Sequence, residues 1–192
     1  MEPGALADLG AVFGREAERV LEIGFGDGEA LLAAAAAEPG RDFLGIEVHR
    51  PGIGRLLNAA ARAGVGNLRV LRMDAAEAVP LLPSGSLAEV RIFFPDPWPK
   101  KRHRKRRLVQ PPFLEALARA VADGGRLLIA TDWEDYALAM REALEASESW
   151  TNAIGPGRFA PRPPERPPTR FERRGLDRGH PVFDLLYLRR PR

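Results

Sequence analysis

Residues 19–28, which read RVLEIGFGDG, give the clearest indication of the fold class. Its apolar part, Arg19–Ile23, is short and ends at a glycine, which predicts a buried strand. Residues 28–37 are rich in Ala and Leu and are followed closely by a Pro-Gly pair, which predicts a helix with a defined end. A strand that turns through three glycines into a helix is typical of an α/β fold that binds a ligand at the turn.

Strand and helix patterns alternate along most of the chain. We predict further strands at 43–46, 68–71, 90–94 and 126–130, and helices at 51–63, 111–122 and 135–146. This order indicates a doubly wound, mostly parallel sheet with helices on both faces. Residues 155–168 are too crowded with Pro, Gly and Arg for regular structure. A last strand at 182–188 is expected to pair antiparallel. Because no long linker divides the sequence, we expect one domain over residues 1–192.

Composition excludes several classes of protein. The chain has 192 residues, of which 45% are hydrophobic and 29% charged, as in a soluble globular protein. It has no cysteine, so disulfides, thiolate metal sites and a cysteine nucleophile are excluded. Its three histidines, His49, His103 and His180, are scattered, and we expect no metal. With neither a secretory signal nor a run long enough to cross a membrane, we expect a cytoplasmic protein.

The glycine loop, Gly24–Gly28, has the spacing G-x-G-x-G. Gly24, Gly26 and Gly28 let the backbone approach a ligand closely. A dinucleotide fingerprint needs its third glycine one position later, where this chain has an acid. The carboxylates of Glu22 and Asp27 would repel a pyrophosphate but attract a sulfonium ligand that carries an ammonium group. The alternative is a glycine-rich turn of some other α/β protein.

Two more acids follow predicted strands. Glu47 comes after the second strand and Asp74 after the third. An ionised carboxylate only accepts hydrogen bonds, so Glu47 suits the two hydroxyls of a ribose. Each acid alone is more often a solvated loop residue. Together with Glu22 they stand at three successive strand ends, which favours a nucleoside pocket.

The most specific segment is residues 91–103, which read RIFFPDPWPKKRH. Aromatic side chains beside prolines form a stiff apolar rim around Asp96, and the prolines restrict the backbone of their neighbours. A similar turn in amino methyltransferases, with both prolines after the acid, accepts the hydrogens of an exocyclic amine. Here one proline precedes Asp96.

A basic run follows this turn directly. Five permanent cations in six residues repel one another unless anions are near. The run is either a solvated loop or a contact to a phosphate backbone, and its place after the turn favours RNA. Its members are Arg102, His103, Arg104, Lys105, Arg106 and Arg107.

A shorter segment after the Pro-rich stretch, Thr169–Glu172, places an aromatic between an arginine and an acid: Thr169, Arg170, Phe171 and Glu172. Such a group can clamp a planar base, with the acid accepting from N1–H and N2–H₂ of a guanine. Alternatively, Glu172 pairs with a neighbouring arginine.

Together these motifs resemble the bacterial tRNA (guanine-N7)-methyltransferase family. The match rests on Glu22–Gly28, residues 94–103, residues 130–132 (Ala-Thr-Asp) and Thr169–Glu172, and spans about residues 20 to 189. The resemblance implies a class I methyltransferase fold, a Rossmann-like seven-stranded sheet whose last strand is antiparallel. It also implies S-adenosylmethionine as cofactor and tRNA as partner, with a target guanosine in the variable loop.

The resemblance also assigns roles. It implies that Glu22, Glu47, Asp74 and Asp96 line the cofactor pocket. Lys100, Asp132 and Thr169–Glu172 would meet the guanosine, and Arg102–Arg107 would touch RNA. No membrane partner is expected, and the oligomeric state, monomer or homodimer, stays open.

The chemistry can be reasoned separately. Guanine N7 has a lone pair and no proton to lose, so orientation rather than a strong base supplies the catalysis. The methylated base is cationic, and a nearby carboxylate favours the transition state. Asp96 is our candidate catalytic residue. Because the deep major groove of A-form RNA hides N7, the target must be a loop guanosine or one displaced from its stack.

Two other classes of function remain. A small-molecule methyltransferase would share the glycine loop without needing the basic run. A catalytically silent RNA-binding module would keep the basic run and tolerate loss of Asp96.

Overall fold

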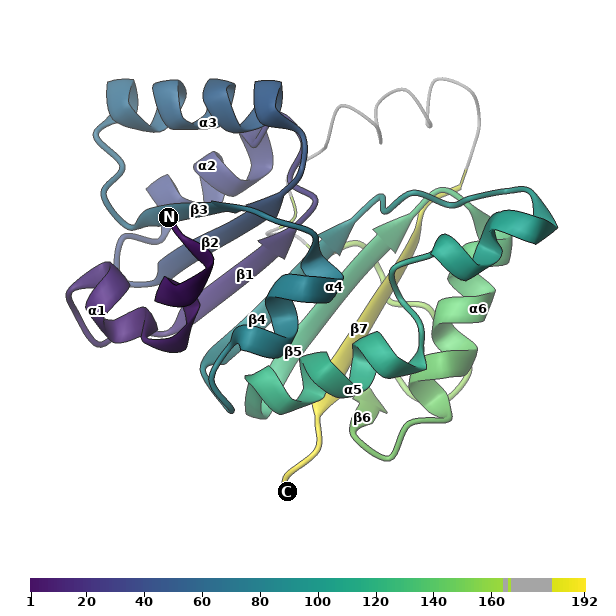
Figure 1. Cartoon of the computed structure of the whole chain (residues 1–192). Helices are drawn as coiled ribbons and strands as arrows, with labels where there is room; N and C mark the ends of the chain where they lie inside the picture. The colour runs from purple at the N-terminus through teal and green to yellow at the C-terminus, as the bar shows by residue number, and fades with distance from the viewer. Residues whose placement is uncertain (164–165, 167–180) are drawn as a thin grey trace.

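The computed structural model describes residues 1–163, 166 and 181–192, and its centre is a seven-stranded sheet (Figure 1). The strands are ordered β3-β2-β1-β4-β5-β7-β6. Neighbours from β3 to β5 pair in parallel, whereas β7 pairs antiparallel with both β5 and β6. The predicted doubly wound sheet with an antiparallel last strand is therefore confirmed. The strands are β1 (Arg19–Ile23), β2 (Asp42–Glu47), β3 (Leu68–Arg72), β4 (Leu87–Phe93), β5 (Val121–Thr131), β6 (Trp150–Asn152) and β7 (Phe183–Arg189).

Helices cover the sheet in two layers (Figure 1). Buried side chains of α2 and α3 share one cluster with one face of β1, β2 and β3. Those of α1, α4, α5 and α6 share a second cluster with the other face. The α-helices are α1 (Leu9–Phe13), α2 (Glu29–Ala37), α3 (Arg50–Ala63), α4 (Ala75–Ala78), α5 (Pro111–Ala120) and α6 (Glu134–Glu145). Short 3₁₀ helices are η1 (Pro3–Ala7), η2 (Val79–Leu81) and η3 (Lys101–Arg106).

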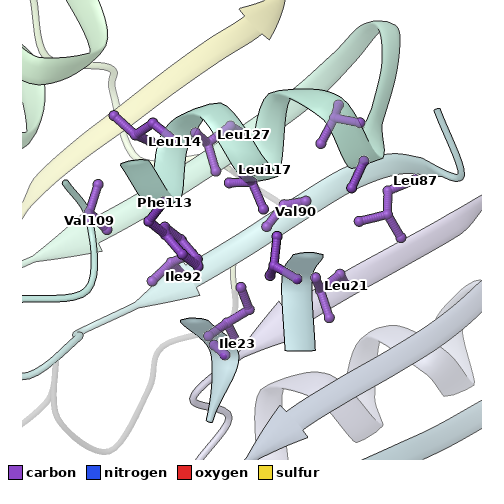
Figure 2. Packing of buried hydrophobic residues seen from close by; sticks show 14 of the residues in the cluster. Leu21, Ile23, Leu87, Val90, Ile92, Val109, Phe113, Leu114, Leu117 and Leu127 are labelled. Atoms are coloured by element: carbon purple, nitrogen blue, oxygen red, sulfur yellow. The ribbon is translucent and has the colours of Figure 1, made fainter. Parts of the chain in front are cut away.

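The central strands are apolar because both of their faces are covered. In β1, Val20 belongs to the α2–α3 cluster, while Leu21 and Ile23 face the larger one, as the two-residue period of a strand requires. Figure 2 shows Leu21 and Ile23 in one layer with Val90 and Ile92 of β4, beneath α5. A parallel strand buried on both faces reads as a continuous apolar run, which is why β1 was predictable.

The largest difference from the predicted boundaries lies between α5 and β5. The helix expected to reach residue 122 ends at Ala120, and Val121 already pairs with Leu87 of β4. The register then shifts, and Gly124 takes a positive φ of 76° inside β5. The Gly-Gly pair thus marks a bulge in a strand rather than a helix end. The three-residue strand β6 was not predicted at all.

The strand order reverses its direction beside β1. From β1 the chain moves to β2 and β3 on one side, then returns to β4 on the other. The loops that leave β1 and β4 therefore diverge, and in doubly wound sheets ligands bind in the crevice at that point. Both the glycine loop and the turn that carries Asp96 start there.

Candidate active site

A cavity of about 1230 Å³ opens at the carboxyl ends of the strands. Its wall includes the glycine loop, the ends of β2, β3 and β4, and part of the basic run. All four acids of the predicted cofactor pocket line it: Glu22, Glu47, Asp74 and Asp96. This volume exceeds the roughly 300–1,000 Å³ that is usual for small-molecule sites.

The glycine loop has a backbone that only glycine adopts without strain. Gly24, Gly26 and Gly28 have φ values of 71°, 58° and 78°. The start of α3 lies against the loop so closely that a Cβ on Gly52 would stand 2.0 Å from the carbonyl oxygen of Gly26. The start of α3 therefore packs against one side of the glycine loop, and the other side of the loop faces the cavity.

Glu22 is a buried acid whose charge is poorly compensated. The residue is 3% exposed, and within the described part of the chain its Oε2 atom has no hydrogen-bond partner. Burial raises the pKa of Glu22 to about 7, although the charge of Arg91 acts in the opposite direction. A buried acceptor without a donor marks a place for one, and a cationic donor suits it best.

Glu47 is held rigidly at the end of β2. Its Oε2 accepts from the Gly26 amide at 2.8 Å, and its Oε1 accepts from the amides of Val48 and His49 at 2.7 and 2.9 Å. A carboxylate has about four acceptor positions, so roughly one remains, on Oε2. The carboxylate thus has room for one further donor, where the sequence suggested two ribose hydroxyls.

Asp74 plays a local role as well as lining the cavity. It is exposed and is the N-cap of α4, where its Oδ1 accepts from the Ala76 amide at 2.8 Å.

The Asp96 turn, Phe94–Trp98, is strained at both ends. Phe94 and Trp98 have positive φ values of 53° and 43°, which are rare for large side chains. Strain of this kind persists only where surrounding contacts enforce it, and it clusters at functional sites. The Phe94 amide continues the sheet by donating to the carbonyl of Ala130 at 2.7 Å. Asp96 itself is exposed at the cavity.

The basic run forms η3 and packs against the same turn. The Trp98 ring meets His103 edge to face at 6.0 Å and lies 5.0 Å from the guanidinium carbon of Arg106. Four of the cations are exposed: Arg102, Arg104, Lys105 and Arg106. The cationic surface of η3 therefore begins at the rim of the cavity.

Arg107 differs from the other cations of the basic run in being buried. Its side chain is only 5% exposed and points inward, to the carbonyl of Pro97 and to Asp135. Protein groups therefore hold this guanidinium, although Arg107 also lines the cavity, and the exposed cations of the basic run end at Arg106. Sequence offered one signal, because the next residues are the apolar Leu108 and Val109.

The remaining predicted site residues either do not line the cavity or lie outside the described residues. Lys100 is exposed and Asp132 is half-buried after β5, but neither is among the lining residues of the cavity. Thr169, Arg170, Phe171 and Glu172 lie outside the described residues, so their predicted contact with guanine stays a prediction.

Sequence reasoning missed Arg91 and its partner. Arg91 stands beside Glu22 in the β1–β4 pairing, and its Nε lies 2.5 Å from Oε1 of Glu89. Both residues are almost fully buried, and Arg41 and Arg126 approach the other Glu89 oxygen at 3.5 and 3.3 Å. Two charges within an apolar strand were the available signal, because such residues are buried only when paired.

The described residues contain neither a cluster suited to a metal ion nor a helix suited to a membrane. Among residues 1–163, 166 and 181–192 no cluster of three or more His, Cys, Asp or Glu side chains is arranged to hold a metal ion. No helix in the same ranges combines the length and apolarity needed to span a membrane.

Comparison with known proteins identifies a methyltransferase family and several relatives by sequence. A family described as "Putative methyltransferase" matches residues 16–185. A tRNA (guanine-N(7)-)-methyltransferase of Halorhodospira halophila is 59% identical over 185 residues, which cover 96% of this chain and 80% of that protein. Proteins with the same name from Alkalilimnicola ehrlichii and Leifsonia xyli are 56% and 55% identical, and the matches cover 79% and 82% of them.

Solved structures agree on the fold. The 16S rRNA methyltransferase KamB superposes with a TM-score of 0.70 at 19% identity, covering 96% of this chain and 94% of that one. A 16S rRNA (adenine(1408)-N(1))-methyltransferase from Catenulisporales acidiphilia gives 0.67 at 17% identity, covering all of this chain and 92% of the other. The fold is that of the class I methyltransferases, and by its sequence the chain belongs to the tRNA (guanine-N7)-methyltransferase family.

Proposed function

We propose that the protein transfers a methyl group from S-adenosylmethionine to N7 of a guanosine in the variable loop of tRNA. The observation that carries this proposal is the single cavity that joins the carboxylates of Glu22 and Glu47 to Asp96 and to the edge of η3. A cofactor site, a candidate catalytic acid and a cationic RNA surface thus adjoin one another. The family named above supports the same reaction.

The residues at the strand ends fit the cofactor. S-adenosylmethionine, when bound, supplies a methyl group made electrophilic by its sulfonium. The Oε2 atom of Glu22 suits the ammonium of the amino-acid part, because it is buried, lies near the glycine loop and has no donor among the described residues. The remaining position on Oε2 of Glu47 suits one ribose hydroxyl, and Asp74 stands where a nucleoside base would follow.

Asp96 would act by charge and by orientation. Guanine N7 carries no proton, so the chain needs to provide no strong base. The base becomes cationic as it is methylated, and a carboxylate fixed beside it lowers the barrier. The strained turn keeps Asp96 at the cavity, and the half-buried Trp98 borders the same space. Lys100, Asp132 and Thr169–Glu172 are proposed to hold the guanosine, on the strength of the family resemblance.

The exposed cations of η3 would hold the tRNA backbone. Arg102, Arg104, Lys105 and Arg106 are exposed on the helix that follows the Asp96 turn. Arginine and lysine contacts to phosphate position an RNA without reading its sequence. This surface distinguishes the proposed enzyme from a small-molecule methyltransferase, which would have no use for it.

The test is to incubate the protein with labelled S-adenosylmethionine and total tRNA, digest the RNA and identify the labelled nucleoside. We expect 7-methylguanosine, mapped to the variable loop. The matched control is Asp96→Asn, which keeps the shape of the side chain and removes its charge. It should retain much of the cofactor affinity and lose most of the transfer. Label in a different nucleoside, label in small molecules only, or an Asp96→Asn enzyme with normal turnover would each contradict the proposal.

A further inference from the structure

We propose that Arg107 is a positioning residue for the Asp96 turn and makes no contact to RNA, although it is the last residue of the basic run. The proposal rests on the function proposed above, since it assigns a part in that reaction. Arg107 differs from the other arginines of the basic run in the contacts that its side chain makes.

The Arg107 guanidinium is occupied on three sides. Its Nε donates to the carbonyl of Pro97 at 2.8 Å, and its Nη2 donates to Oδ2 of Asp135 at 2.5 Å. Its guanidinium carbon lies 4.7 Å from the centre of the Tyr136 ring, within range of a cation–π contact. The fixed planar fork of an arginine allows all of these contacts together.

The neighbouring Arg104 shows the contrast. It approaches Oδ1 of the same Asp135 at 3.0 Å, but its side chain is 46% exposed. Arg104 can exchange that surface pair for a phosphate at little cost, because exposed ion pairs contribute little. Arg107 would have to leave the partly buried carbonyl of Pro97 and the ring of Tyr136. The hydrogen bond from Arg107 also holds the pKa of Asp135 below its usual value, so this partner stays charged.

The hydrogen bond between Arg107 and Pro97 acts on the position of Asp96 through the backbone. Pro97 follows Asp96 directly, and its carbonyl belongs to the peptide unit that leads into the strained Trp98. Holding that carbonyl fixes the peptide plane between the two strained ends of the turn. Beyond Arg107, the Val109 amide donates to the Tyr136 hydroxyl at 3.0 Å, which secures the segment on the α6 side as well. Without this anchor the turn would relax toward an ordinary backbone and move Asp96.

The experiment compares three variants with the parent enzyme: Arg107→Lys, Arg107→Gln and Arg102→Gln. For each we would measure kcat and KM for tRNA, S-adenosylmethionine affinity, and the salt dependence of tRNA binding. Arg102 is exposed in the same run, so Arg102→Gln should reduce the log–log salt slope by about 0.7–0.9. Its KM for tRNA should rise as well, because a contact to the phosphate backbone is lost.

Arg107→Gln should leave the salt slope unchanged, because no phosphate contact is lost. Arg107→Lys should lower kcat by roughly 10- to 100-fold, as expected when a reacting group shifts by about 1 Å, with KM and cofactor affinity little altered. This variant keeps the charge, so it decides the matter even if Arg107→Gln does not fold.

A slope that falls for Arg107→Gln as it does for Arg102→Gln, or an unchanged kcat in Arg107→Lys, would overturn the inference. A parent that binds tRNA without methylating it would instead refute the proposed function. The salt slope would then still decide whether Arg107 contacts phosphate.

Discussion

Replacing Glu22 by glutamine tests the electrostatics of the cofactor pocket most directly. Glutamine keeps the shape and cannot ionise. In the parent, burial raises the pKa of Glu22 from 4.5 to about 7, so the folded protein holds a proton that the unfolded chain has released across this range. The stability contributed by that proton is fully present below pH 4.5 and is lost as the pH rises through about 7.

The size of the effect follows from the pKa. The interval from 4.5 to about 7 corresponds to about 3 kcal/mol of unfolding free energy lost by the parent between these limits. For a chain of this length, that equals a fall in Tm of roughly 6 to 12 °C. Glu22→Gln has no such dependence, so at pH 8 without cofactor it should be more stable than the parent by up to about 3 kcal/mol.

Cofactor binding should show the opposite preference. An ammonium donor needs the ionised carboxylate, so the affinity of the parent for S-adenosylmethionine should rise with pH up to about 7 and then level off. Glu22→Gln should bind it weakly at every pH. The pH dependence separates a charged contact from loss of shape.

The assay is thermal unfolding by circular dichroism at pH 5, 6, 7 and 8, paired with calorimetric titration of S-adenosylmethionine. Glu142→Gln, on the exposed side of α6, is a matched control for loss of a surface carboxylate. Parallel stability curves for the parent and Glu22→Gln would refute the reasoning. So would equal affinity of both for the cofactor at pH 8.

Other predictions address stability and binding. Gly52→Ala would place a Cβ 2.0 Å from a carbonyl of the glycine loop and should cost at least about 1–3 kcal/mol and impair cofactor binding, whereas Gly54→Ala, with open space around its Cβ, should stabilise α3 by about 0.5–1 kcal/mol. Glu47→Ala should weaken cofactor binding in calorimetry by about 1–3 kcal/mol, and unchanged affinity would exclude its role. Asp184→Asn removes the charge opposite the buried guanidinium of Arg166 at 2.9 Å, and denaturant titration should show a loss of about 3 kcal/mol.

Most of the sheet could be predicted because its strands are buried on both faces and bounded by glycine or proline. The same reasoning missed Trp150–Asn152, which is too short for a period to be visible. It also extended a helix through Val121, because an apolar residue after Pro111–Ala120 fits either element. Only the pairing of Val121 with Leu87 decides between them, and pairing is a tertiary property.

The candidate site was predictable as a set of residues but not in its internal contacts. Strand ends in a parallel sheet converge, so Glu22, Glu47 and Asp74 could be expected at one cavity. Composition could not tell which arginine of the basic run turns inward, since that depends on Asp135 from a distant helix. Nor could it show that backbone amides take up most of the capacity of Glu47, because loop geometry lies beyond sequence pattern.

The position of β7 has a consequence for how the protein is made. Residues 183–189 leave the ribosome after the strands β1 to β6, yet they lie between β5 and β6 inside the sheet. Until they emerge, β5 has an open edge and β6 lacks the strand that it pairs with. An open edge invites association with other chains, so the nascent protein passes through a stage vulnerable to aggregation. Translation stalled shortly before residue 183 should yield a sheet finished on the β3 side and incomplete on the other.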